Sequence, residues 1–240
     1  MKRIIFLFSF IVPLLISCQV KADNWLKSVW GDGHVTKESR KVDSFDGIKT
    51  SAGIDVYLFQ GDEEKVVVET DDNLQDCIKT EVKGSTLHCY IDCRVRHSSM
   101  MKVYVNYKML NKIDASSGSD VRGETVMKAE SLRIESSSGA DVKLEVEAQN
   151  ISCSSSSGAD ILIKGKAEDF RGNASSGADI KADGLTVKTC NVSASSAGDI
   201  RITVTDRIDA DASSGGDVVY YGKPDIEHVH ESSGGDVSRR

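Results

Sequence analysis

The sequence is poor in aromatic residues and proline, and it lacks the apolar spacing of helices. Aromatic side chains make up 6% of the 240 residues, and proline occurs 2 times. Outside the extreme N-terminus, no long segment carries apolar side chains at a helical spacing, which disfavours helical and leucine-rich repeats. The shortage of aromatic side chains disfavours a ligand site built on aromatic walls.

An excess of positive charge is also missing. The chain has 30 Lys and Arg against 37 Asp and Glu, a net charge of −7. Loss of Lys2 and Arg3 with the leader described below would take the charge from −7 to −9. Binding of DNA or RNA depends on neutralising phosphates with basic side chains. Nucleic acid is therefore not expected as a partner.

What the sequence has in abundance is one pentapeptide, Ser-Ser-Gly-x-Asp, at a period of about 20 residues. Successive copies begin 21, 19, 19, 20, 18 and 19 residues apart. A fixed period of this size is typical of a solenoid, in which each repeat covers the core of its neighbour. The copies are SSGSD from Ser116, SSGAD from Ser137, Ser156 and Ser175, SSAGD from Ser195, and SSGGD from Ser213 and Ser232.

Alternating apolar residues flank each copy and predict strands. Pairs such as Ile161/Ile163 follow the Asp, and pairs such as Leu132/Ile134 precede the serines, which is the period-two pattern of a half-buried strand. Each coil is predicted as strand, tight corner, strand, and a looser polar return such as Lys164–Asp169. The sequence thus predicts an all-β fold, a parallel β-helix with about 19–20 residues per coil.

The composition of the corner is consistent with a sharp turn. The third position is Gly except at Ala197, and there Gly198 follows, so one residue of each corner is free to take a positive φ. The Ser and Asp side chains are expected to bond backbone N–H groups that the corner leaves unpaired. We interpret the pentapeptide as a structural motif.

The N-terminus has the features of a bacterial lipoprotein leader. A basic start is followed by 13 apolar residues, Ile4–Ile16, too short a run for a membrane span. The ending Leu15-Ile16-Ser17-Cys18 resembles a lipoprotein cleavage box. The resemblance implies a signal peptide over residues 1–17 and acylation of Cys18, which then anchors an exported protein in the cell envelope, at the outer membrane. Residues 18–33 are predicted as a tether, whose Trp25 and Trp30 are expected to pack onto the end of the fold; a binding role for exposed tryptophan is the alternative.

The rest of the chain is predicted to form one domain over residues 34–240. Its regular repeats occupy 116–240, and 34–115 is a diverged, β-rich beginning that caps the same solenoid. Ser51–Val56 is a degenerate forerunner of the corner, and Gly84-Ser85 is a hairpin turn. The predicted strands of this part are 56–59, 66–68, 78–82, 87–93 and 101–105.

Five cysteines remain besides Cys18, an odd number that forbids complete pairing. Cys77 is expected to pair with Cys89 or with Cys93, since the envelope allows oxidation. Cys89 and Cys93 lie roughly 13 Å apart along one strand and cannot pair with each other. The other two, Cys153 and Cys190, take inward positions and are expected to act as small buried apolar residues.

Several short motifs, in their order along the chain, resemble the head GIN domain of auto-transporter adhesins. They lie at residues 45–48, 53–58, 60–62, 72–74 and 78–82, followed by the recurrent Ser-Gly turns. The resemblance runs from about Gly31 to the C-terminus. It implies a right-handed β-helix shaped like the pectin lyases without their catalytic residues, and a role in adhesion of Gram-negative bacteria.

The Asp residues of the repeats are expected to form an outward column, one rung apart. Carboxylates ~4.8 Å apart repel one another by about 1 kcal/mol in water, and cations two positions along (Arg122, Lys143, Lys181 and Arg201) are expected to offset this. We interpret the column as structural and expect no metal. Calcium stays an alternative, because RTX repeats use Gly and Asp at β-helix corners, although at a period of nine. The column comprises Asp120, Asp141, Asp160, Asp179, Asp199, Asp217 and Asp236.

No other constellation predicts chemistry. No rung gathers extra acids and bases, and no His recurs near the serines, so no catalytic residue is assigned. His228 and His230 share a face but are expected to point to solvent, and Tyr220 and Tyr221 are expected to be the main outward aromatics of the repeats.

The sequence therefore predicts a non-catalytic envelope lipoprotein that acts by adhesin-like surface contact, without a cofactor. Its partner would be a protein or glycan of a host or cell surface, and self-association through the open ends or a flat face is compatible with the fold. Two alternatives remain: a carbohydrate-processing enzyme of pectin-lyase shape, and an envelope structural or signalling protein with no host ligand.

Overall fold

The computed structural model of the protein describes residues 28–240, in which β-strands predominate. The strands of the N-terminal part are β1 (Ser28–Trp30), β2 (Val35–Arg40), β3 (Gly47–Thr50), β4 (Asp55–Gln60), β5 (Lys65–Asp71), β6 (Ile78–Lys83), β7 (Thr86–Ile91), β8 (Arg94–His97) and β9 (Met101–Tyr107), with one 3-10 turn, η1 (Asp72–Leu74). The strands of the repeats are β10 (Lys112–Ser116), β11 (Asp120–Gly123), β12 (Met127–Ser137), β13 (Asp141–Ser156), β14 (Asp160–Ser175), β15 (Asp179–Ser195), β16 (Asp199–Ser213), β17 (Asp217–Tyr221), β18 (Ile226–Ser232) and β19 (Asp236–Arg239).

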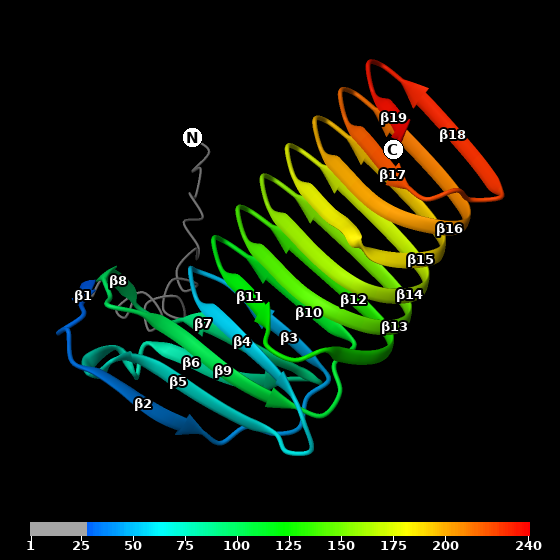
Figure 1. Ribbon diagram of the computed structural model, residues 1–240. Coiled ribbons are helices and arrows are strands. Elements are labelled where there is room, and N and C mark those ends of the chain that lie inside the picture. The colour runs from blue at the N-terminus through cyan, green and yellow to red at the C-terminus, as the bar shows by residue number, and fades with distance from the viewer. Residues whose placement is uncertain (1–27) are drawn as a thin grey trace, which may run out of the picture.

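The repeats stack as parallel rungs, which confirms the predicted β-helix (Figure 1). Each strand pairs in parallel with the equivalent strand of the next rung, and the pairing keeps corner against corner: Ser156 lies beside Ser175, and Asp160 beside Asp179. A one-residue slip would turn every buried side chain outward. The 19-residue period and the alternation of apolar residues therefore fix the same register.

Backbone groups hold the corners. The second Ser and the third residue both have positive φ, for example Ser157 (57°) and Gly158 (68°), and Ala197 adopts the same conformation (59°). The N–H of the third residue in each pentapeptide donates to the carbonyl of the second Ser in the next rung. For example, the N–H of Gly158 donates to the carbonyl oxygen of Ser176 at 3.2 Å. The prediction that corner side chains bond the corner N–H groups is confirmed at the first corner, where the N–H of Ser116 donates to Ser119 Oγ at 3.2 Å. At later corners the hydroxyls of Ser136 and Ser155 instead donate to backbone carbonyls, and the N–H groups of residues such as Gly158 and Asp160 bond the main chain along the stack.

The polar return between strands is also different from the prediction. Lys164–Asp169 lies inside the 16-residue strand β14, which pairs with β13 almost without interruption. The strand turns at Gly165, whose φ is +120° and whose Cα faces the backbone of Val146 one rung below. The inward residues of this segment, Gly165 and Ala167, are small, and the outward ones are charged. The segment is therefore a bent strand rather than a loop.

The core is a set of apolar columns between the two faces of each rung. One column contains Val142, Ile161, Ile180 and Ile200, all essentially fully buried. Elsewhere a large residue is offset by a small neighbour: a Cβ on Gly172 would come within 2.8 Å of the ring of Phe170. Compensation of this kind keeps the interior close-packed although the rungs differ in sequence.

The N-terminal part joins the solenoid as its first rungs. β3 and β4 pair in parallel with β10 and β11, and β7 and β9 pair in parallel beneath them. The degenerate corner predicted at Ser51–Val56 is confirmed, with positive φ at Ala52 and Gly53. Antiparallel pairings of β2 with β5, β5 with β9 and β6 with β7 cover the lower end, which protects its edge.

One disulfide staples this lower end. Cys77 pairs with Cys93, with 5.5 Å between their Cα atoms, which decides between the two predicted partners. Cys89, Cys153 and Cys190 are free thiols and buried. The predicted role of Cys153 and Cys190 as buried apolar residues is confirmed.

Around β1 the structure departs from the sequence-based expectation. Trp25 lies outside the described residues. Trp30 does not pack onto the fold, because 67% of its surface is exposed, and its strand pairs only with β8. The connection after β1 is held by the buried Asp71, which accepts bonds from the N–H groups of Gly33 (3.0 Å) and Ser99 (2.7 Å). No helix in the described part of the chain is long and apolar enough to cross a membrane.

The rung formed by β18 and β19 carries charges at core positions. Glu227 and Glu231 stand in register above the buried Ile208 and Ala212. Arg239 Nη1 lies 3.2 Å from Glu227 Oε1, and Glu231 accepts a bond from the N–H of Val237. Inward-pointing charges at an edge disfavour pairing with another sheet, so this rung opposes end-to-end association.

Candidate functional site

The Asp residues of the repeats lie in one column, as predicted, and the column is longer than the repeats. In-register pairs join them from Asp120 to Asp236. Asp55 of β4 adds an eighth carboxylate beneath Asp120, and Lys102 of β9 ends the row.

Cations neutralise only part of the column. Arg122 pairs with Asp120 at 3.1 Å, and Lys181 bridges Asp160 (2.7 Å) and Asp179 (3.1 Å). Asp141 has no cation within ion-pair distance among residues 28–240. Burial raises the pKa of Asp141, and the charges of Asp120 and Asp160 raise it further.

A hollow of about 570 Å³ lies over this part of the column. Arg122, Lys143, Lys164 and Lys181 line it together with the carboxylates. Within the part of the chain that the structure describes, no three His, Cys, Asp or Glu side chains are arranged to hold a metal ion. The arrangement is a mixed ion-pair ladder. Asp141 has no cation within 4.0 Å among residues 28–240, and the same holds for Asp55, Asp199, Asp217 and Asp236 of the column.

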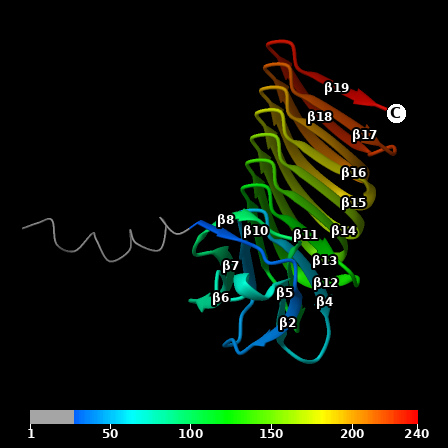
Figure 2. The same ribbon diagram turned by 90° about the vertical axis from the view of Figure 1, so that its left-hand side faces the viewer.

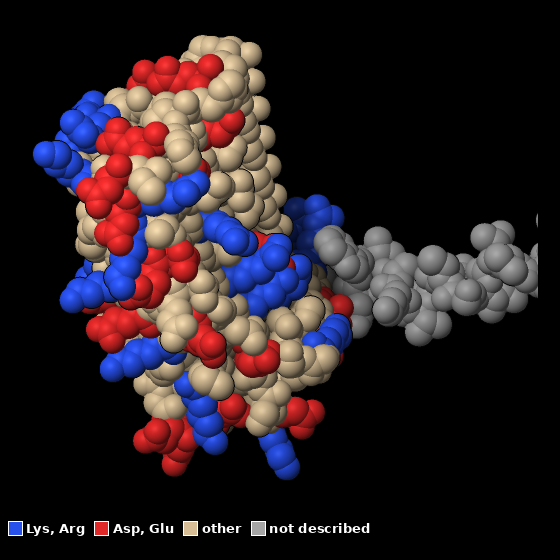
Figure 3. Space-filling model, turned by 90° about the vertical axis from the view of Figure 1, so that its right-hand side faces the viewer, with Lys and Arg blue, Asp and Glu red and all other residues tan. Residues whose placement is uncertain are grey.

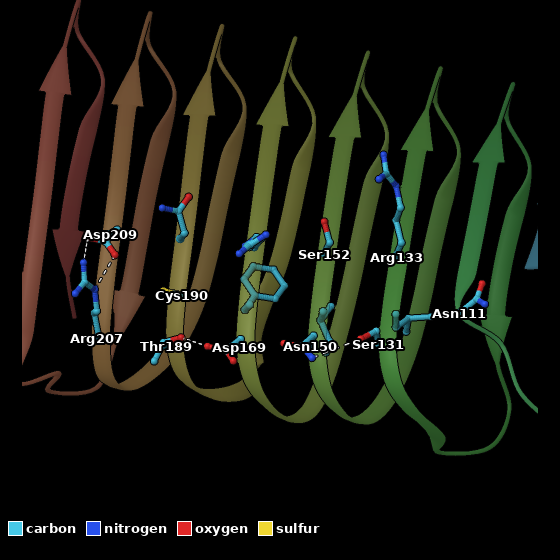
Figure 4. A pocket seen from close by; sticks show the side chains of 15 residues that line it. Asn111, Ser131, Arg133, Asn150, Ser152, Asp169, Thr189, Cys190, Arg207 and Asp209 are labelled. Carbon is cyan, nitrogen blue, oxygen red and sulfur yellow. Dashed lines mark hydrogen bonds and ion pairs between the residues drawn. The ribbon is translucent and has the colours of Figure 1, made fainter.

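The other face of the rungs carries a larger depression, the polar groove, of about 870 Å³. It runs across six rungs just before the corners: Asn111, next to β10, lies at one end, and the neighbouring strands β12–β16 each contribute side chains (Figure 4). The outward residues that line it are Asn111, Ser131, Arg133, Asn150, Ser152, Asp169, Arg171, Thr189, Asn191, Arg207 and Asp209. They offer mainly amides, hydroxyls and guanidinium groups.

Three arginines of the groove differ in their partners. Arg133 binds Glu135 through two bonds of 2.9 and 2.6 Å, and Arg207 binds Asp209 through bonds of 2.8 and 3.1 Å. Arg171, midway between them, is exposed and forms no ion pair with any carboxylate of residues 28–240. The groove therefore presents one free guanidinium at its centre, with Ser152 and Asn191 in register on either side.

Asp209 does not have the properties of a catalytic acid. Its bonds to Arg207 lower its pKa, and His228 Nδ1, 2.7 Å from Oδ1, lowers it further, against the opposite effect of burial. A general acid in glycoside cleavage needs a raised pKa. The other groove carboxylate, Asp169, accepts a bond from Thr189.

Sequence reasoning missed this groove, although a signal for it existed. On β12–β16 its outward residues lie at two fixed offsets, six and four positions before the first Ser of each corner; for Ser175 these are Asp169 and Arg171. The residue types at these offsets vary between rungs, so a search for repetition passes over them.

A second missed feature is an aromatic cluster on the outward side of β4 and β9. Tyr57 and Tyr104 stack with 5.2 Å between ring centroids. Lys37 lies over the Tyr104 ring and Lys102 over the Tyr57 ring, and the Tyr104 hydroxyl donates to Glu69 at 2.6 Å. Because lysines and the partner ring contact the ring faces, the cluster is not an open stacking platform.

The remaining predicted residues are placed as follows. Cys18 lies outside the described residues. His228 and His230 are both exposed, as expected. Tyr220 is buried, with 5% of its surface exposed, and only Tyr221 is partly accessible; the expectation for Tyr220 is wrong because its side chain belongs to an inward column.

Charged side chains are mixed rather than separated by sign. Figure 3 shows acidic and basic groups interspersed along one side of the molecule, while the opposite upper border is free of them. This pattern gives no continuous basic stripe on the visible face, of the kind that a nucleic-acid backbone requires.

The chain resembles several solved structures along most of its length. It is 23% identical to a "putative adhesin" from Bacteroides fragilis NCTC 9343, covering 88% of this chain and 100% of that one, with a TM-score of 0.83. It is 21% identical to a "putative adhesin" from Parabacteroides merdae ATCC 43184, covering 89% of this chain and 99% of that one, with a TM-score of 0.73. It is 25% identical to a "putative adhesin" from Parabacteroides distasonis ATCC 8503, covering 88% of this chain and 100% of that one, with a TM-score of 0.71.

Among curated proteins, none matches the chain significantly. The sequence matches the family described as "Putative auto-transporter adhesin, head GIN domain" over residues 44–224, which takes in most of the rungs described above. The chain therefore belongs to the head GIN domain family.

Proposed function

We propose that this protein is an exported, lipid-anchored, non-catalytic adhesin whose polar groove binds an extended acidic glycan. The observation that carries the proposal is Arg171, a free guanidinium in a groove lined by amides and hydroxyls. The planar fork of Arg suits a carboxylate. Hydroxyl and amide groups suit the hydroxyls of a sugar chain.

The repeat of the fold supports a polymeric ligand. Each rung adds one pair of outward side chains at a spacing of ~4.8 Å. A ligand with its own repeat would gain contacts rung by rung, while a compact small molecule would use only part of the groove. Such contact needs no chemical step, which agrees with a family of adhesins.

A glycan array with the described chain tests this, followed by titration of the best acidic ligand. Arg171→Gln removes the free charge and is expected to weaken binding about 10–100-fold, since bonds to charged groups contribute about 1.5–3 kcal/mol. Lys143→Gln, the same charge change on the opposite face, is the matched control and should leave affinity unchanged. Equal affinities of Arg171→Gln and the unmodified protein would contradict the proposal.

The enzymatic alternative is favoured by the position of Asp141 in a hollow among Asp120, Asp160 and basic residues, with a raised pKa, although Asp55 and Asp199 of the same column share that direction of shift. Carboxyls whose pKa values are set apart are typical of acid–base pairs. A lyase and hydrolase screen on acidic polysaccharides is expected to show no turnover. Turnover that Asp141→Asn abolishes would replace adhesion by catalysis.

The proposed anchorage is tested separately. Cells expressing the chain should incorporate labelled palmitate into it, and Cys18→Ala should abolish the label. Protease treatment of intact cells then distinguishes the outer surface from the periplasm. An unlabelled protein that fractionates without membranes would contradict the anchor but not the glycan site.

A further inference from the structure

A small two-stranded sheet lies apart from the long one at the beginning of the described chain. β1 and β8 pair only with each other, and Figure 2 shows β8 beside the first described strand. Trp30 of β1 and the exposed Arg94, Arg96 and His97 of β8 define the β1–β8 surface. This surface adjoins a shallow depression of about 520 Å³, whose lining includes Ile91 and Met101.

The β1–β8 surface combines an exposed indole with unneutralised positive charge. Of the Trp30 surface, 67% is exposed. Neither Arg94 nor Arg96 has a carboxylate within 4.0 Å in residues 28–240, and Arg96 donates only to the hydroxyl of Ser28. The molecule as a whole is acidic, so two free arginines on one short strand are a local exception.

The sequence places this surface near the proposed anchor. Ser28 lies ten positions after Cys18, and ten steps of the chain span at most about 36 Å when fully extended. With Cys18 held in a bilayer, β1 cannot lie further from the headgroups than this. Tryptophan is enriched at membrane interfaces, and arginine is attracted to anionic lipid headgroups.

We propose that the β1–β8 surface docks on anionic phospholipid headgroups, with Trp30 at the interface and Arg94 and Arg96 on the phosphates. The docking sets the orientation of the solenoid relative to the membrane. The orientation of the solenoid rests on the lipid anchorage proposed above. The residues that make the contact with the headgroups all lie in the described part of the chain. The anchor raises the effective concentration of headgroups, so a surface of only two arginines and one indole suffices.

The test uses the chain from Cys18 onward, which contains every strand of the fold. A phospholipid coupled through a maleimide to Cys18 supplies the anchor whether or not cells acylate this residue, because the free thiols of the described chain are buried. Trp25→Phe leaves Trp30 as the single tryptophan. Quenching of Trp30 fluorescence by brominated phosphatidylcholine is measured in vesicles with and without phosphatidylglycerol.

We expect quenching in vesicles that contain phosphatidylglycerol, and its loss at high salt. Removing each arginine should lower the ratio of docked to undocked protein roughly fivefold, so Arg94→Gln with Arg96→Gln should lower it about 25-fold. The matched control, Arg201→Gln with Lys223→Gln, changes two exposed cations of the distant rungs and should leave the ratio unchanged.

Three results would overturn the proposal: no quenching in anionic vesicles, equal quenching with and without phosphatidylglycerol, or an equal effect of the control pair. Circular dichroism of each variant confirms that the fold is retained. Because the lipid is attached chemically, a failure of palmitate labelling in cells leaves this measurement valid.

Discussion

Replacing Gly165 by Ala should destabilise the protein far more than replacing a corner glycine. Gly165 has a φ of +120°, and a Cβ there would lie 2.0 Å from the carbonyl oxygen of Val146, a backbone atom in the rung below. Gly158 has a φ of +68°, and its Cβ would meet nothing within 4 Å. Ala197 already occupies the corner conformation, so the cost at Gly158 is only conformational, about 1 kcal/mol.

At Gly165 two costs combine. Overpacking costs about 1–3 kcal/mol and a strained backbone conformation another 1–3 kcal/mol, so the two together cost about 2–6 kcal/mol. In a chain of this size, about 1 kcal/mol lowers Tm by roughly 2–4 °C. We therefore expect Tm to drop by about 4–24 °C for Gly165→Ala and by about 2–4 °C for Gly158→Ala.

Thermal unfolding followed by far-UV circular dichroism measures both, with urea titration as an independent scale. Because solenoids unfold by fraying as well as globally, the two variants are compared at one heating rate and one protein concentration. If Gly165→Ala proves no less stable than Gly158→Ala, the bent strand does not pack as described, and the account of the return segment is wrong.

Three further predictions concern the N-terminal part and the last rung. Burial raises the pKa of Asp71, but the hydrogen bonds that it accepts from Ser99 and Gly33 outweigh burial, so that the folded-state pKa is lowered. Ionised Asp71 therefore stabilises the fold above about pH 4, and this stabilisation is lost as the pH falls through the folded-state pKa. Asp71→Asn should lower the free energy of unfolding by about 1–3 kcal/mol at neutral pH, and this free energy, measured by urea titration, should then fall less steeply toward acid pH than in the unmodified protein. An equally steep fall in both proteins would refute this. Reducing the Cys77–Cys93 disulfide, whose cysteines are 16 residues apart, should cost about 3 kcal/mol in the same titration, and no shift on reduction would contradict it. Glu227→Leu with Glu231→Ala should promote self-association in light scattering, because it continues the apolar columns to an exposed edge; a monomeric variant would refute the capping role.

The regular rungs could be predicted because two independent patterns agree. The corner repeats every 18–21 residues, and inward residues such as Ile161 and Ile163 alternate at a fixed distance from it. Only one register satisfies both. The Asp column and the degenerate corner at Ala52 and Gly53 followed from the same reasoning.

The return segment could not be predicted in this way, since its inward residues are too small to give an apolar signal. Gly165 and Ala167 alternate with Lys164, Lys166 and Glu168, and such a segment is indistinguishable from a polar loop by composition. In a solenoid the neighbouring rungs supply backbone partners, so strand pairing continues without large apolar residues.

The polar groove and the β1–β8 surface could not be predicted from the sequence for a different reason. The polar groove depends on side chains such as Arg171 and Asn191 that share a position but not an identity. The β1–β8 surface depends on a parallel pairing of segments more than 60 residues apart, which no local pattern in the sequence indicates. Both require the register of the strands before they become visible.

The backbone ladder at the corners has a practical consequence. Since the side chains of residues such as Ser157 point away from that ladder into open solvent, the protein is a scaffold on which foreign groups can be mounted in a row. Cysteines introduced there and labelled with probes would stand at intervals of ~4.8 Å along a straight line, a molecular ruler for calibrating short-range distance measurements.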